Sequence, residues 1–238
     1  MKSTIQAAML LAIIINLTTA MPNLASAHSS PELDRKAKDE LQALARSSGA
    51  TFRISWNEQT GTPSAISGRL TSVSRHTTEW IATQFIARNK HLFGLKSPEK
   101  NMKIKAVKAL PGGTRTVHLE RYLFDTPVYG DYIKLTIDVQ GVVTAVESLI
   151  YPQLEKQLFN RPAHSVLSSE QAIRKAQAQL SPAQMAQLQQ QPTARLYYLP
   201  FRAGLPLVYE VTFLHRNQLF AERMWIHAVM GHSLDPAL

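Results

Sequence analysis

The fold of this chain is decided by residues 116–151, which read TVHLERYLFDTPVYGDYIKLTIDVQGVVTAVESLIY. Apolar and polar residues alternate along three parts of this stretch, which are 116–124, 128–139 and 142–151. A period of two is typical of strands with one buried face, and Gln140-Gly141 between the last two parts fits a hairpin turn. A further alternating segment, 102–107, precedes the turn Pro111-Gly112-Gly113. The pattern therefore predicts an antiparallel meander of about four strands.

Helices and short strands are expected before this meander. Residues 31–46 have the apolar spacing of an amphipathic helix, with Ser30 as N-cap and Pro31 at the first helical position. The alternating segment 51–56 predicts a strand that pairs with a return strand at about 65–70. A second helix is predicted from Thr78 to Arg88.

A smaller unit is predicted after a linker at 159–168. Ser168 and Gln171 form a capping-box pattern that starts a helix, and 182–191 fits either a second helix or a polar loop. Three strands are then expected, at 194–199, 207–214 and 220–229. The whole chain is therefore predicted to be α+β, with two units of helix packed on antiparallel sheet, at 28–160 and 161–238.

Residues 1–27 have the pattern of a signal peptide. Lys2 precedes an apolar run from Ala7 to Leu17, and Ala25-Ser26-Ala27 fits the small-x-small pattern of a cleavage site. The run is too short for a membrane-spanning helix, and no Cys follows it to carry a lipid anchor. We therefore expect a secreted or periplasmic protein that begins at His28 and does not span a membrane.

Composition excludes several classes of function. The chain of 238 residues has no Cys, which excludes disulfide scaffolds, Cys-ligated zinc and thiol chemistry. Its formal charge is +9, and removal of Lys2 with the signal peptide leaves +8. The densest basic patch lacks the interleaved aromatic residues of a nucleic-acid-binding surface, so it is interpreted as a solvated face. Attraction to an anionic envelope polymer is the alternative. The patch consists of Lys96, Lys100, Lys103, Lys105 and Lys108.

No catalytic signature is present. The motifs HExxH, GxSxG, GxGxxG and the Walker loop do not occur. His227 and His232 are separated by a spacing that fits no metal motif, and His28 alone does not make a copper site. Glu120, Asp125 and Asp131 are potential glycosidase carboxylates, but Asp125 and Asp131 are expected on turns or strand ends, where Asp usually bonds to the backbone. We predict no catalytic residue, no metal and no cofactor, and therefore no enzyme.

Large aromatic residues fall at helix or strand spacings, so they are predicted to lie in the core, with a binding groove as the alternative. They are Trp56, Trp80, Phe85, Phe93, Tyr122 and Tyr129.

Several segments resemble the propeptides of thermolysin-like and fungalysin-like zinc metallopeptidases. Those similar to the first propeptide domain (FTP) are 61–63, 66–70, 85–100, 117–122, 126–130 and 138–143. Segments 207–211 and 225–234 resemble the PepSY domain that follows it in these propeptides. Asp125-Thr126 replaces the usual Gly before Pro-Val, and His227 replaces the usual Asp of the last PepSY strand. The catalytic domain that normally follows is not part of this sequence, so the chain resembles a free-standing propeptide.

The resemblance implies a protein that binds a thermolysin-class metallopeptidase in trans, as an inhibitor or a folding chaperone. The segment that such propeptides send toward the active site corresponds to the C-terminal tail of this chain, and we expect this tail, or its terminal carboxylate, to reach the zinc cleft as a strand that is not cleaved. The tail consists of Ser233, Leu234, Asp235, Pro236, Ala237 and Leu238. Two alternatives stay open: a cell-envelope module that binds wall polymer or peptide, and a remnant of a metallopeptidase zymogen.

Overall fold

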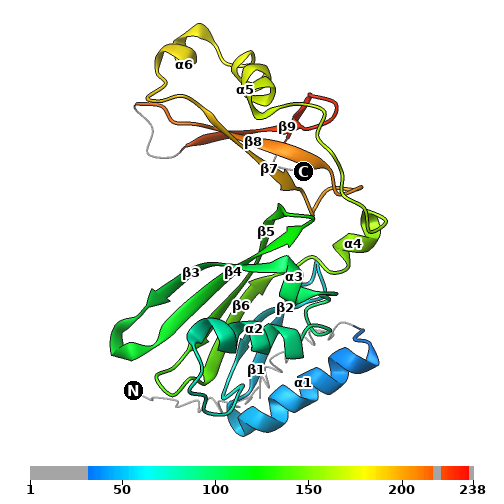
Figure 1. The fold of residues 1–238 in the computed structure, drawn as a ribbon, viewed down its shortest axis with the longest axis vertical. Helices are drawn as coiled ribbons and strands as arrows, with labels where there is room; N and C mark the ends of the chain where they lie inside the picture. Colours follow the sequence, from blue (N-terminus) through cyan, green and yellow to red (C-terminus); the bar gives the residue numbers. More distant parts are fainter. Residues whose placement is uncertain (1–31, 217–220, 236–238) are drawn as a thin grey trace, which may run out of the picture. The chain divides into compact units, whose positions relative to one another are not determined.

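The computed structural model describes residues 32–216 and 221–235 (Figure 1). The predicted signal peptide, His28 and the helix start at Ser30 and Pro31 lie outside these residues. The described chain is α+β, as predicted, with short helices and strands of one mixed sheet. Across the described residues, no helix is both long and apolar enough to cross a membrane.

The predicted meander is confirmed. Each strand in it pairs antiparallel with the next, and the first runs two residues further than expected. The four strands are β3 (Met102–Ala109), β4 (Arg115–Leu123), β5 (Thr126–Ile137) and β6 (Val143–Leu149). The hairpin β1 (Arg53–Trp56) and β2 (Pro63–Ser67) adds to the outer edge of β6 through β2. The predicted return strand therefore begins and ends earlier than 65–70.

Helix α1 (Arg35–Ser48) begins four residues later than predicted. The carboxylate of Asp34 accepts a hydrogen bond of 2.8 Å from the Ala37 N–H, so Asp34 is the N-cap in place of Ser30. The prediction was wrong here because Asp34, four residues after Ser30, caps the helix. Helix α2 (Thr78–Arg88) has the predicted bounds and is capped by Thr77. A short helix, α3 (Pro98–Asn101), and two 3₁₀ turns, Gly49–Thr51 and Pro111–Gly113, complete this part.

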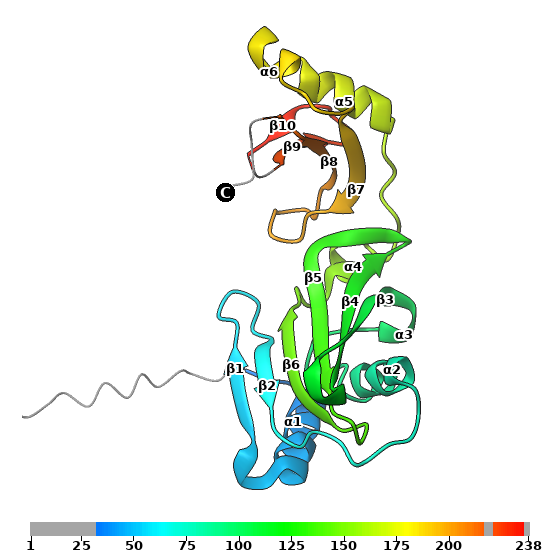
Figure 2. The ribbon, with the colours of Figure 1, turned by 90° about the vertical axis from the view of Figure 1, so that its left-hand side faces the viewer.

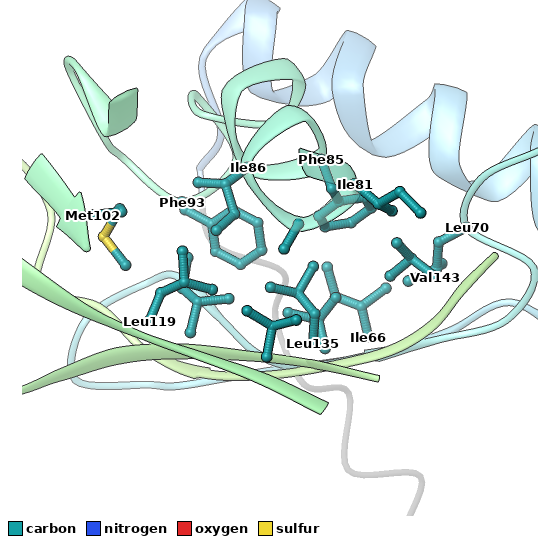
Figure 3. Close-up of a cluster of buried hydrophobic side chains, with 14 of the residues drawn as sticks. Ile66, Leu70, Ile81, Phe85, Ile86, Phe93, Met102, Leu119, Leu135 and Val143 are labelled. Carbon is teal, nitrogen blue, oxygen red and sulfur yellow. The ribbon is translucent and has the colours of Figure 1, made fainter. Parts of the chain in front are cut away.

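The first core lies between α2 and the inner face of the meander (Figure 3). Phe85 and Ile86 of α2 and Phe93 of the following loop pack on Leu119 and Leu135 of the sheet, and all five are almost inaccessible to water. Burial of each such side chain contributes about 1.5–3 kcal/mol to stability. This outcome confirms the core prediction for Phe85 and Phe93. Trp80, in contrast, is 42% exposed on α2, so its core prediction was wrong.

The second part of the chain packs a helix on the strands that follow it. Helix α4 (Leu154–Gln157) comes first, and α5 (Ser169–Gln177) has the predicted capping box of Ser168 and Gln171. A second capping box starts the short helix α6 (Pro182–Ala186), so the ambiguous segment 182–191 is helical only at its beginning. Three strands follow as predicted, β7 (Thr193–Tyr198), β8 (Leu207–Phe213) and β9 (Glu222–His227). A fourth, β10 (Ser233–Leu234), was not predicted.

The two sets of strands join at a single parallel pair, Val128 of β5 with Tyr198 of β7. A second core gathers around α5, and Leu123, Val128 and Leu154 from the preceding part of the chain belong to it. The domain boundary near residue 160 stays a prediction.

Candidate partner-binding site

The sheet formed by β7–β10 has one face covered by helix and one that is not. Side chains alternate between the two faces of a strand, so neighbouring residues of each strand point to opposite faces of the sheet. Tyr209, Val211 and Ile226 face α5, where they pack against Ala172 and Ala176. In the described part of the chain no helix covers the opposite face, as Figure 2 shows for α5 and α6. We call this opposite surface the helix-free face.

Strand register arranges the residues of the helix-free face in rows. One row runs across four strands because Arg195 pairs with Glu210, Glu210 with Trp225, and Trp225 with Leu234. The next row contains Tyr197, Val208 and His227. The helix-free face is defined by these seven residues together with Arg223, Leu199, Tyr129 and Phe201.

Aromatic rings form the centre of this face. Trp225 is buried beneath Tyr129 and Phe201, with ring centroids 4.6 Å and 5.5 Å away. Tyr197 meets Tyr129 edge to face at 5.4 Å. Phe201 remains 37% exposed, so the cluster leaves an apolar surface accessible to solvent. Tyr129, one of the aromatic residues considered for the core or for a binding groove, belongs to this cluster.

Charged side chains surround the aromatic cluster. The carboxylate of Glu210 lies 3.6 Å from Arg223 Nε, and Arg195 faces Glu210 from the other side by register. Burial raises the pKa of Glu210, and the two guanidinium groups oppose that rise. Arg195 also lies over the Tyr197 ring at 5.1 Å. Trp, Tyr and Arg are the residues most enriched in the energetic centres of protein interfaces.

The C-terminal segment is anchored on this face. Leu234 packs against the Trp225 cluster, and the Ser233 hydroxyl donates a hydrogen bond of 2.9 Å to Gln179 Oε1. The Arg202 guanidinium donates to the backbone carbonyl of Asp235. Of the predicted tail, Leu234 therefore lies at the aromatic cluster, Ser233 bonds to the residue that follows α5 by two positions, and Asp235 is held by Arg202. Pro236, Ala237 and Leu238 lie outside the described residues.

His227 and His232, whose spacing fits no metal motif, lie close together. The rings of His227 and His232 stack with centroids 5.2 Å apart, at the end of β9 and the start of β10. Among residues 32–216 and 221–235, no cluster of three or more His, Cys, Asp or Glu side chains could hold a metal ion.

The three potential glycosidase carboxylates are held apart by different partners. Asp125 lies on the turn between β4 and β5 and pairs with Lys103 at 2.8 Å, and Glu120 lies 3.5 Å from Lys105. Asp131 was expected on a turn or strand end, and this prediction was wrong: it lies inside β5, where it is buried against Arg121. Burial raises the pKa of Asp131 to about 7, although Arg121 opposes the rise.

Sequence reasoning missed the buried Arg121 and the anchoring of the tail. The signal for Arg121 was present, because it follows Val117 and Leu119 at alternate positions of β4, on the same buried face.

The lysine patch is partly neutralised, since Lys103 and Lys105 both pair with carboxylates.

Comparisons with known proteins give structural similarity but no sequence similarity. No protein-family model matches the chain, and no curated protein sequence matches it. The Bacillus megaterium YpeB C-terminal domain is a similar solved structure, with a TM-score of 0.36 and 12% sequence identity, covering 85% of this chain and 96% of that one. The function is therefore inferred from the residues of this chain.

Proposed function

We propose that this chain is an exported, propeptide-like protein that binds a thermolysin-class zinc metallopeptidase supplied as a separate chain. Binding would inhibit the peptidase or assist its folding. The observation that carries this proposal is the helix-free face, on which the C-terminal segment is anchored beside Trp225.

The composition of the face supports a protein partner. It combines a buried Trp225, the half-buried Tyr129 and Tyr197, and the charged rim of Arg195 and Arg223. This arrangement of apolar centre and charged rim is typical of specific interfaces, which bury about 1,600 Å² in total. The partner class comes from the resemblance of the sequence to an FTP domain followed by a PepSY domain.

The anchored segment supports a defined mode of action. Leu234 and the Asp235 carbonyl are fixed to the face, so residues beyond Asp235 start from a set position. A segment held at its base loses less conformational entropy on entering a cleft than a free tail would. We propose that residues 236–238 enter the active-site cleft of the peptidase while the face docks on its surface.

A capture experiment tests this proposal. Purified His28–Leu238 is immobilised, exported proteins of the source organism are passed over it at moderate salt, and retained proteins are identified by mass spectrometry. A zinc peptidase is expected on the wild-type protein and to be depleted on Phe201→Ala. The matched control is Phe159→Ala, which removes a phenyl ring that is 85% exposed and is not part of the helix-free face. Retention of wall polymer alone, or equal retention by all three proteins, would contradict the proposal.

A further inference from the structure

The turn that joins β9 to β10 sets the position of the C-terminal segment. The His227 N–H donates a hydrogen bond of 2.9 Å to the His232 carbonyl, and the Gly231 N–H donates one of 2.8 Å to the His227 carbonyl. Gly231 has a φ of 75°, and a Cβ there would come within 2.7 Å of Lys175 Cε. The turn is therefore tight, and its closure brings Leu234 opposite Trp225.

The side chain of His227 also bonds to the backbone of this turn. Its Nδ1 lies 3.2 Å from the backbone nitrogen of Val229 and 3.2 Å from that of Met230. A backbone N–H can only donate, so Nδ1 must accept both hydrogen bonds and must carry no proton. The ring is neutral in this arrangement, with its proton on Nε2.

Protonation of His227 would remove both of these hydrogen bonds. An added proton on Nδ1 converts the acceptor to a donor that faces two other donors. It would also place a positive charge 5.2 Å, centroid to centroid, from the ring of His232. Both effects act on the turn that holds the C-terminal segment.

We propose that His227 is a pH sensor that holds the C-terminal segment on the helix-free face when neutral and releases it when protonated. Release of the segment on protonation is a property of the isolated chain. That this release controls peptidase binding rests on the proposed function. Acidification would thus weaken the seating of Leu234 on Trp225.

The groups around His227 favour its neutral form. Burial lowers the pKa of His227, and the neighbouring His232 lowers it further. From α5, Lys175 lies against Gly231, and from β8 the residue paired with His227 is the apolar Val208. In the segment preceding α5, the backbone N–H groups of Val166 and Leu167 donate to the Ala228 carbonyl, next to His227 in the chain. The effect of His232 therefore adds to the effect of burial.

The sign of the pH dependence follows from this shift. An unfolded or released His takes up a proton near pH 6.5, whereas His227 in the closed turn takes it up at lower pH. The released form binds more protons over this window, so the closed turn loses stability as the pH falls below about 6.5.

Nuclear magnetic resonance on the isolated protein tests the proposal without any peptidase. The measured quantity is the nuclear Overhauser effect between the Leu234 methyl groups and the Trp225 ring, followed from about pH 7.5 to about pH 5 while the His227 ring titration is recorded. The expected result is a loss of about threefold or more, with its midpoint at the His227 pKa. His227→Asn keeps an acceptor oxygen near the Nδ1 position but cannot be charged, so its signal should persist at acid pH.

Two controls make the outcome decisive. His232→Asn removes the neighbouring imidazole that lowers the pKa of His227, so it should move the midpoint to higher pH. His118→Asn, on β4, should leave the transition unchanged. A wild-type signal that persists after His227 is protonated would overturn the proposal. So would an equal loss in His227→Asn, or no signal at any pH. Failure of the capture experiment would leave this result unaffected.

Discussion

Asp131 on β5 lies against Arg121 on the neighbouring strand β4, with the carboxylate 3.2 Å from the guanidinium and neither side chain accessible to water. Glu155 of α4 contacts the same guanidinium at 2.9 Å, and Arg121 also donates to the Tyr151 carbonyl. Asn101 of α3 donates to Glu155. One buried arginine thus ties the meander to the helix that leads into the second part of the chain.

Replacing this arginine should be strongly destabilising. Arg121→Met removes the guanidinium that pairs with two buried carboxylates, Asp131 and Glu155, and breaking such a network costs about 3–5 kcal/mol. Urea unfolding at neutral pH measures the loss. The control is Lys134→Met, which breaks an exposed pair with Glu147 and should cost less than about 1 kcal/mol. Equal losses in the two variants would show that Arg121 is not a structural centre.

Asp131→Asn should change the pH dependence of stability. Burial raises the pKa of Asp131 to about 7 in the folded chain, against an ordinary value near 3.8. Between these values the folded chain binds the extra proton, so the contribution of Asp131 is present below about pH 4 and is lost as the pH rises through 7. The Asn variant does not ionise, so its stability relative to wild type should increase from pH 5 to pH 8. A relative stability that falls over this range would contradict this assignment.

Two glycines offer a matched pair for testing the hairpin between β5 and β6. Gly141 and Gly112 have φ of 74° and 77°, but only a Cβ at Gly141 meets another atom, the Ser74 carbonyl oxygen at 2.1 Å. Gly112→Ala should therefore cost about 1–2 kcal/mol from backbone strain alone. Gly141→Ala should cost clearly more, because the loop at Ser74 must move. Thermal unfolding of both variants measures the difference, and equal melting temperatures would refute the close approach.

Truncation tests the role of the C-terminal segment. Removal of residues 233–238 takes away Leu234 from Trp225 and the strand that pairs with β9. We expect inhibition of the captured peptidase to weaken by about tenfold or more, because these contacts position the segment. A tenfold loss corresponds to about 1.4 kcal/mol of binding free energy. Circular dichroism should confirm that the truncated protein remains folded. Unchanged inhibition would exclude the segment from the mechanism.

The fold could be predicted because local signals agreed with the tertiary structure. Alternation placed β3–β6, and the capping box at Ser168 placed α5 within one residue. The predicted start of α1 was wrong because Ser30-Pro31 matches a helix-start pattern, whereas the hydrogen bond from the Ala37 N–H makes Asp34 the N-cap. Strand β10 has two residues, too few for any periodicity, so only its pairing with β9 reveals it.

The candidate site was predicted only in part. The C-terminal segment was identified through the family resemblance, but the aromatic face beneath it combines residues from β5, β7, β9 and the loop at Phe201. Such a cluster depends on which residues of β5 and β7 pair with each other, and the pattern of a single sequence does not predict that pairing. Asp131 was misplaced on a turn because Gly130 beside it is a turn residue by composition, whereas the strand continues through both.

The most direct test is the peptidase activity of exported proteins from the source organism, measured with a fluorogenic thermolysin substrate with and without purified His28–Leu238. The same assay is repeated on samples that have been denatured and refolded. We predict that the wild-type protein lowers the activity that a zinc chelator also abolishes, or raises the recovery of that activity on refolding, and that Phe201→Ala does neither. Chelator-sensitive activity that is unchanged by the wild-type protein in both fresh and refolded samples would contradict it.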